Sequence, residues 1–424
     1  MIKILDYKEL KDKSVIASPK PINDVSETVR EIIATVREKG DAALYDYEAR
    51  FDKVALTSLA VSVEEIEEAL SLVEADFLAV IRKAAENIRE FHSKQLRQGF
   101  EMRRGEGIVL GQRITPIERV GLYVPGGTAA YPSTVLMDSI PAKIAGCPKV
   151  VMVTPPGKDG KVNPVILAAA SVAGVDEIYK VGGAQAIAAL AYGTESVPKV
   201  DKIVGPGNAF VAEAKKQVFG VVSIDMIAGP SEILVVADGG SDPRFVAADM
   251  LSQAEHDRNA SAVLVTDSPS LAKGVQGAIE ALLTGMARRD IARASIDNNG
   301  KIILVEDILQ GIDVANAIAP EHLELCVEEP FSYLPKVKHA GSVFLGRNCP
   351  EAIGDYYAGM NHTLPTCGTA RFSSPLSVDD FIKKTQYAYY SADALAEVAD
   401  EVALFAKKEG LTGHAKSATI RSEE

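Results

Sequence analysis

The sequence predicts an α/β protein with two similar, incomplete Rossmann-like lobes of the doubly wound type and small helical elements at its ends. Short apolar runs end in glycine and give way to small-residue helical stretches, as in V-G-L-Y-V-P-G-G and E-I-Y-K-V-G-G-A-Q. Such alternation is typical of βα units on a parallel sheet. Two segments, starting at Asp138 and Asp249, each read as a helix, a break and a strand ending in V-x-V-T. We therefore hypothesise an internal duplication.

The elements follow in chain order. Residues 24–96 have a helical pattern, with candidate capping boxes at Asp24 and Ser62 and apolar residues at helical spacing from Phe77 to Phe91. The last fifty residues again have a helical pattern. Between them, strands are predicted from about Val120 onward, at Val150–Thr154, Ala262–Thr266, Ile302–Val305 and Ser342–Leu345.

These patterns divide the chain into four predicted parts. Residues 1–23 form an N-terminal arm, and residues 376–424 form a C-terminal helical element. Residues 24–119 and 238–375 together form a first, discontinuous α/β lobe with a helical N-terminal part. Residues 120–237 form the second α/β lobe.

Composition limits the class of partner. The chain has 424 residues, of which 45 are basic and 58 acidic, so the net charge of −13 argues against nucleic acid or an anionic membrane. No stretch approaches the ~18 apolar residues of a membrane span, and we expect a cytoplasmic protein. The cysteines show no CxxC pair and fit a reducing compartment: Cys147, Cys326, Cys349 and Cys367. A metal site must then use His, Asp, Glu or Gln.

Four of the six histidines lie in short segments rich in Asp, Glu, Asn or Gly. In Q-A-E-H, Gln253 and His256 share one helix face. Asp355 and His362 flank a glycine-containing segment, and His414 follows glycine near the chain end. Taken singly, each has an ordinary alternative: a surface histidine, a turn residue, a solvated terminal histidine. Together, Gln253, His256, Asp355 and His414 are nitrogen and oxygen ligands suited to zinc.

The motif A-P-E-H-L-E-L places Glu321 beside His322. An adjacent carboxylate and imidazole suit general acid–base catalysis near neutral pH. The alternative is a helix N-terminus, with Glu321 placed favourably against the helix dipole. The glycine turns could admit phosphates, but no G-x-G-x-x-G followed by a distant acidic residue is present, so spacing alone names no dinucleotide.

Eight motifs, in order along the chain from about residue 20 to its end, closely resemble the histidinol dehydrogenase family. They are R-V-G-L-Y-V-P-G-G, V-G-G-A-Q-A-I-A-A-L-A-Y-G-T, D-K-I-V-G-P-G-N, A-G-P-S-E, L-S-Q-A-E-H-D, A-P-E-H-L-E-L, N-H-T-L-P-T and G-L-T-G-H-A-K-S. The resemblance implies oxidation of L-histidinol through its aldehyde to L-histidine, the last two steps of histidine biosynthesis, with two NAD and one zinc ion per subunit.

The resemblance also implies roles for individual residues. Glu321 and His322 would be the acid–base residues, and His362, which lies in a matching motif, would either support the metal ligands or orient substrate. The zinc ligands would be Gln253, His256, Asp355 and His414. The NAD contacts, in the second lobe, would be Tyr123, Gln185 and Asn208. The substrate contacts would be Ser231, Gln253, His256, His322, Asp355, Glu409 and His414.

A homodimer is also implied, in which the C-terminal element with His414 completes the neighbour's metal site. Two other functions use the same residues. A zinc hydrolase would activate water with the metal and Glu321 and need no nucleotide. A non-catalytic zinc or amino-acid-binding protein would need neither Glu321 nor His322.

Overall fold

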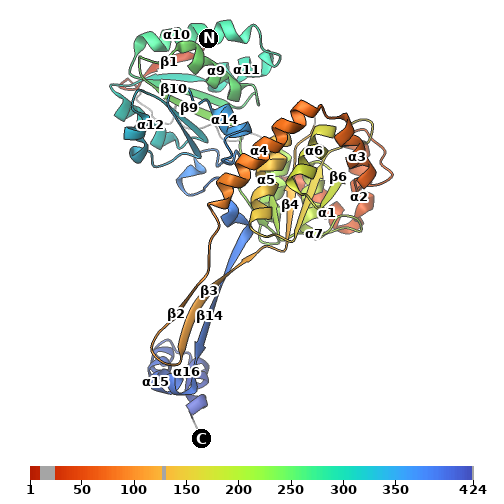
Figure 1. The fold of residues 1–424 in the computed structure, drawn as a ribbon, viewed down its shortest axis with the longest axis vertical. Coiled ribbons are helices and arrows are strands. Elements are labelled where there is room, and N and C mark those ends of the chain that lie inside the picture. The colour runs from red at the N-terminus through yellow and green to blue at the C-terminus, as the bar shows by residue number, and fades with distance from the viewer. Residues whose placement is uncertain (10–23, 127–129, 423–424) are drawn as a thin grey trace. The chain divides into compact units, whose positions relative to one another are not determined.

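The computed structural model describes residues 1–9, 24–126 and 130–422, so most of the predicted N-terminal arm lies outside the described residues. The chain divides into two compact units. Unit 1 comprises residues 1–95 and 118–381, and unit 2 comprises residues 96–117 and 382–424 (Figure 1). Among the described residues, no helix combines the length and apolar character that crossing a membrane requires.

Unit 1 contains a six-stranded parallel sheet. Its order is β1 (Lys3–Asp6), β11 (Lys301–Leu304), β10 (Ser261–Thr266), β9 (Glu232–Ala237), β12 (His322–Cys326) and β13 (Ser342–Leu345). The helices that follow these strands are α9 (Pro243–Ala254), α10 (Pro269–Leu283), α11 (Arg289–Asn299), α12 (Ile308–Ile318), α13 (Pro330–Tyr333) and α14 (Glu351–Tyr356).

Both faces of this sheet are buried. Alternate residues of β9 face opposite ways: Ile233 and Val235 pack in a core with α9, α10 and α11, whereas Leu234 and Val236 pack in a core with α12. Strands covered on both sides have to be apolar throughout, which explains the uninterrupted apolar runs in the sequence. The predicted strands at 262–266, 302–305 and 342–345 are confirmed within one residue.

Unit 1 also contains a five-stranded parallel sheet. Its order is β6 (Glu177–Lys180), β5 (Lys149–Thr154), β4 (Arg119–Tyr123), β7 (Lys202–Val204) and β8 (Ser223–Ile224). Its own helices are α5 (Pro132–Ile144), α6 (Pro164–Ala173), α7 (Gly183–Tyr192) and α8 (Ala209–Val218).

The two sheets share one topology. In each, five successive strands have the order third, second, first, fourth, fifth, with β1 added at the edge of the larger sheet. The two similar sequence segments occupy equivalent places, because one covers α5 and β5 and the other covers α9 and β10. In both sheets, therefore, they are the first helix and the second strand of the series.

The N-terminal helices pack on the five-stranded sheet. They are α1 (Ser26–Lys39), α2 (Asp41–Phe51), α3 (Val63–Leu72) and α4 (Ala75–Ser93), and their main contacts are with α5, α6, α7 and α8. The predicted ranges 24–119 and 238–375 grouped these helices with the other sheet, so that grouping differs from the observed contacts. Helical periodicity identifies an apolar face but does not identify the sheet that covers it.

Of the two capping boxes predicted from the sequence, the structure contains one. Ser62 accepts a hydrogen bond from the Glu65 amide and Glu65 accepts one from the Ser62 amide, so this capping box is confirmed. Asp24 accepts a hydrogen bond from the Ser26 amide, but α1 begins only at Ser26 and its cap residue makes no side-chain hydrogen bond.

Unit 2 is an antiparallel ribbon carrying two helices at one end (Figure 1). Its sheet has the order β14 (Ile382–Tyr390), β3 (Ile108–Pro116) and β2 (Phe100–Arg103), followed in the chain by α15 (Ala392–Lys408) and α16 (Thr412–Thr419). The expected C-terminal helices are present, but the expectation was wrong for residues 382–390. Most side chains of β14 are exposed, so the strand has no apolar alternation to reveal it, and pairing with β3 defines it.

Candidate active site

The candidate site lies at the amino ends of β9 and β12. Glu321 immediately precedes β12 and His322 is its first residue, so these residues are not at a helix N-terminus. β12 lies between β9 and β13 in the sheet interior, which buries both side chains. Ser231 immediately precedes β9, so it also lies at the amino ends of these parallel strands.

The backbone of Glu232 holds the Glu321–His322 pair. Its amide donates to Glu321 Oε2 at 2.8 Å, and its carbonyl lies 3.0 Å from His322 Nδ1. A carbonyl only accepts, so His322 Nδ1 carries the proton and donates. The other ring nitrogen, Nε2, is therefore the atom that can exchange a proton or bind a metal.

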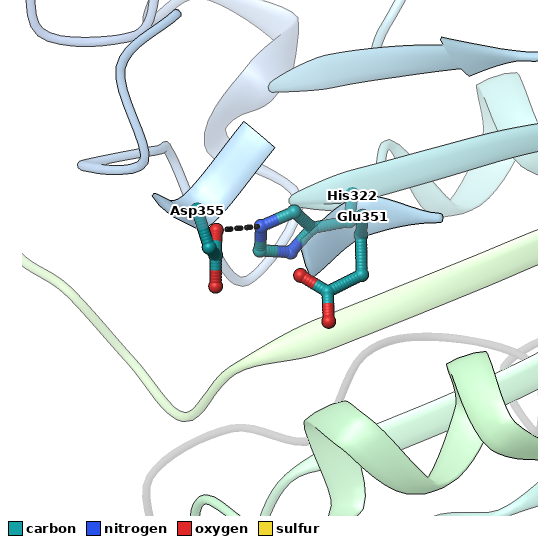
Figure 2. A group of neighbouring side chains, drawn as sticks. All are labelled: His322, Glu351 and Asp355. Atoms are coloured by element: carbon teal, nitrogen blue, oxygen red, sulfur yellow. Dashed lines mark ion pairs between the residues drawn. The ribbon is translucent and has the colours of Figure 1, made fainter. Parts of the chain in front are cut away.

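His322 Nε2 faces a carboxylate (Figure 2). Asp355 Oδ1 lies 3.5 Å from this atom, and Glu321 Oε2 lies 3.6 Å from Nδ1. Burial on its own would lower the pKa of His322, but Glu321 and Asp355 outweigh that effect and raise the pKa. Burial raises the pKa of Glu321 well above the ordinary glutamate range.

The short helix α14 supplies two carboxylates. Glu351 lies near Glu324 of β12, since the Glu351 amide donates to Glu324 Oε1 at 2.8 Å. Asp355 lies one helical turn after Glu351, about 6 Å further along the axis of α14. Two residues of a β-strand span a similar length, and His322 is two residues before Glu324 on β12, so Asp355 lies beside His322. Ligand atoms of His322, Glu351 and Asp355 all lie within 4.8 Å of one another. Figure 2 shows these three side chains as neighbours.

Several polar atoms here are buried without a hydrogen-bond partner among the described residues: Gln253 Nε2, His322 Nε2 and Glu351 Oε2. The other oxygen of Glu351 accepts from Ser252 Oγ at 2.5 Å. The Gln253 amide lies close to Glu351 but completes no hydrogen bond with it. A buried unpaired polar atom is costly, so His322 Nε2 and Glu351 Oε2 fit a bound cation, whereas Gln253 Nε2, a donor, fits a polar ligand that offers an acceptor.

The predicted metal ligands of unit 1 converge on this cluster. Gln253 is buried in the last turn of α9, and His256 follows that helix. Burial lowers the pKa of His256 and of His362, and the charge of Asp355 acts on both rings in the opposite direction. Both imidazoles are therefore neutral at pH 7, which is the form that binds a metal.

Glu409 and His414 lie in unit 2, where both are exposed. Glu351 was missed by sequence reasoning, although its spacing of four residues before Asp355 was an available signal on a helix. The role of the Glu232 backbone had no sequence signal, because any residue type carries the same amide and carbonyl.

The residues implied as NAD contacts lie together on the five-stranded sheet. Tyr123 ends β4 and Asn208 caps α8 after β7, the two adjacent strands where the strand order reverses. In open parallel sheets, nucleotides commonly bind at the carboxyl ends of the strands where the strand order reverses. Gln185 lies in the first turn of α7, where the Gly183 amide donates to the Tyr123 hydroxyl at 3.1 Å.

Comparisons with known proteins agree with the motifs. The profile of the histidinol dehydrogenase family matches residues 17–422. The chain is 56% identical over 398 residues to histidinol dehydrogenase from Clostridium acetobutylicum, covering 94% of this chain and 92% of that protein. It is 55% identical over 400 residues to the enzyme from Bacillus thuringiensis subsp. konkukian, covering 94% and 93%.

The fold agrees as well. The crystal structure of histidinol dehydrogenase from Elizabethkingia anophelis superposes with a TM-score of 0.94 at 39% identity, covering 99% of this chain and 98% of that one. Sequence and fold match over nearly the whole length of both proteins. The chain therefore belongs to the histidinol dehydrogenase family.

Proposed function

We propose that this protein oxidises L-histidinol through L-histidinaldehyde to L-histidine, with NAD as the hydride acceptor and one zinc ion per subunit. Family membership over the whole chain supports the reaction. The single observation that carries the chemistry is the buried pair Glu321 and His322, fixed by the Glu232 backbone so that the other ring nitrogen of His322 faces Asp355.

We propose that Gln253, His256, Asp355 and, from a partner subunit's C-terminal element, the equivalent of His414 hold the zinc ion. The neutral imidazole of His256, and the unpaired Glu351 oxygen close to Asp355, support a cation at this place. Bound zinc would orient the substrate as a Lewis acid, because zinc has no redox chemistry of its own. His322 lies close to Asp355, but in this proposal it transfers protons and does not bind the zinc ion.

Two hydride removals complete the reaction. In the first, His322 Nε2, in the neutral form of the ring, takes the alcohol proton while the carbon gives its hydride to NAD, leaving the aldehyde. Glu321, in its ionised form, then takes a proton from water as the water oxygen attacks the aldehyde carbon, and His322 returns its proton to the aldehyde oxygen, which gives the hydrate. His322 Nε2 then takes a proton from a hydroxyl of the hydrate while the carbon gives a second hydride to a fresh NAD, leaving the carboxylic acid, and Glu321 releases its proton to solvent. We propose that the lobe formed by residues 120–237 binds NAD through Tyr123, Gln185 and Asn208.

A direct assay separates this function from its rivals. Histidinol and NAD, added to the purified protein, should give NADH absorbance and two NADH for each histidine formed. A zinc hydrolase would give no NADH and would cleave amide or peptide substrates. A zinc or amino-acid-binding protein would give neither product, and replacing Glu321 or His322 would leave its ligand affinity unchanged.

We propose a homodimer with shared sites. Large apolar side chains of unit 2 are solvent-exposed and would be covered by a partner: Val402, Leu404, Phe405, Leu411 and Ile420. Mixing inactive His256→Ala and His414→Ala variants tests this arrangement. A heterodimer recovers one intact site only if each site draws on both chains, so partial recovery of activity is expected, and no recovery would contradict shared sites.

We also propose that the two sheets arose by internal duplication. Their common strand order and the equivalent places of the two similar segments support this. Superposition of the five equivalent strands and their helices tests it, and a different path of the connecting helices would contradict it. The sparse cysteines, which form no CxxC pair, fit a reducing compartment and support a cytoplasmic location.

A further inference from the structure

Glu48 is a buried carboxyl group in α2 that reaches the start of α7. Its Oε1 accepts from the Gly182 amide at 3.2 Å and from Gln185 Nε2 at 3.1 Å. Gly182 lies in the turn between β6 and α7, and Gln185 lies in the first turn of α7. A side chain from a distant part of the sequence therefore holds this turn and the first polar side chain of the helix.

Two backbone amides at the start of α7 are occupied by the protein's own groups. The first amides of a helix normally form an anion-binding position. Here the Gly182 amide is occupied by Glu48 and the Gly183 amide by the Tyr123 hydroxyl. These amides are therefore used to fix Tyr123 and Gln185 relative to each other.

The turn itself has little freedom. Gly183 has a φ of +62°, and a Cβ there would meet Gln185 Oε1 at 2.7 Å. A Cβ at Gly182 would meet Pro155 Cβ at the same distance. Gln185 Nε2 donates to Glu48, so the other atom of the Gln185 side-chain amide, Oε1, lies beside Gly183. Oε1 is therefore the atom of Gln185 that can accept a hydrogen bond from a ligand at this turn.

We propose that Glu48 is a positioning residue of the NAD site, which fixes the Gly182–Gly183 turn and the orientation of the Gln185 amide. This inference rests on the proposed function, in which Gln185 and Tyr123 contact NAD. Glu48 itself touches neither cofactor nor substrate in this scheme. Its effect is expected in the affinity for NAD more than in the turnover rate.

The chemistry of Glu48 makes a specific conservative variant informative. Burial raises the pKa of Glu48 to about 8, and the hydrogen bond from Gln185 opposes this shift. Nearby Asp52, whose pKa burial also raises, adds to the shift. Near neutral pH a protonated Glu48 can still accept both hydrogen bonds through its carbonyl oxygen, and an amide oxygen would do the same. Glu48→Gln should therefore preserve the site, whereas Glu48→Ala should not.

The test measures NADH affinity by fluorescence titration, with KM for NAD, kcat and thermal midpoint for each variant. We expect Glu48→Ala to weaken NADH binding about tenfold, equal to about 1.4 kcal/mol, with kcat changed less than about twofold. Glu48→Gln should stay within about twofold of the parent protein. Glu48→Asp, which is one methylene shorter, provides a second variant if Glu48→Ala does not fold.

A matched control comes from the same pair of helices. Thr194 Oγ1, just after α7, donates to Asp41 Oδ1 of α2 at 2.6 Å. Thr194→Val should lower the thermal midpoint without changing NADH affinity. If Glu48→Ala and Glu48→Asp also leave NADH affinity unchanged while Gln185→Ala weakens it, the positioning role is overturned and the NAD site stands. If Gln185→Ala leaves the affinity unchanged as well, the proposed NAD site itself fails.

Discussion

Glu321→Gln is the most informative substitution in the candidate active site. Glu321 Oε2 accepts from the Glu232 amide at 2.8 Å, and a glutamine oxygen can accept the same hydrogen bond. His322 is held independently, because its Nδ1 donates to the Glu232 carbonyl. The variant should therefore keep the local structure and lose only the carboxylate that takes a proton from water.

The expected magnitudes differ between the two half-reactions. Loss of a general base typically costs about 100-fold to 10,000-fold in rate, and we expect this for aldehyde oxidation. We expect alcohol oxidation, which uses His322 Nε2, to fall by less than about tenfold. In contrast, Glu321→Ala would leave the Glu232 amide without its acceptor and lower the free energy of unfolding by about 1–3 kcal/mol.

The assay follows NADH formation with histidinol and, separately, with supplied histidinaldehyde. Single-turnover measurements separate the first hydride transfer from the second. Urea unfolding of Glu321→Gln and Glu321→Ala tests whether the amide preserves the hydrogen bond. Equal rate losses in both half-reactions, in a variant with unchanged stability, would refute the division of labour between Glu321 and His322.

Three further predictions concern the metal, a buried acid and a helix cap. His256→Ala and His414→Ala should each lower bound zinc in elemental analysis, and full zinc content in both would rule out their role as ligands. Burial raises the pKa of Asp138, which accepts from Thr363 Oγ1 at 2.7 Å, to about 8 from its ordinary 3.8. Its contribution to stability is full below about pH 3.8 and is lost as pH rises through about 8. Asp138→Asn should therefore reduce the loss of unfolding free energy between about pH 6 and 9 by at least about 1 kcal/mol, and an unchanged urea-unfolding profile would contradict this. Ser62→Ala removes the confirmed cap of α3 and should cost about 1 kcal/mol in urea unfolding, so an unchanged midpoint would contradict the role of the cap.

The sequence alone was sufficient for the family and for most of the parallel strands. Ordered motifs such as A-P-E-H-L-E-L carry the family resemblance, and alternating apolar runs and glycine turns predict βα units. The capping box at Ser62 was also predictable, since its two hydrogen bonds join residues three positions apart. These signals are local, so they are readable without knowing how distant segments meet.

Sequence patterns could not identify the interactions that join distant segments. Glu48 meets Gln185 across 137 positions, and the Glu232 backbone meets His322 across 90. Neither contact has a spacing or composition signal, and backbone groups are the same in every residue. The same limit applied to β14, which is defined by its pairing with β3.

The sequence by itself determined the family, the alternation of helices and strands, and the residue types available for acid–base and metal chemistry. Only the tertiary structure decided which sheet the N-terminal helices cover, and that Glu351 joins Asp355 beside His322. The physical reason is range. Propensity, capping and periodicity act over a few residues, whereas a catalytic site forms where the packing of whole elements brings distant side chains within hydrogen-bond distance.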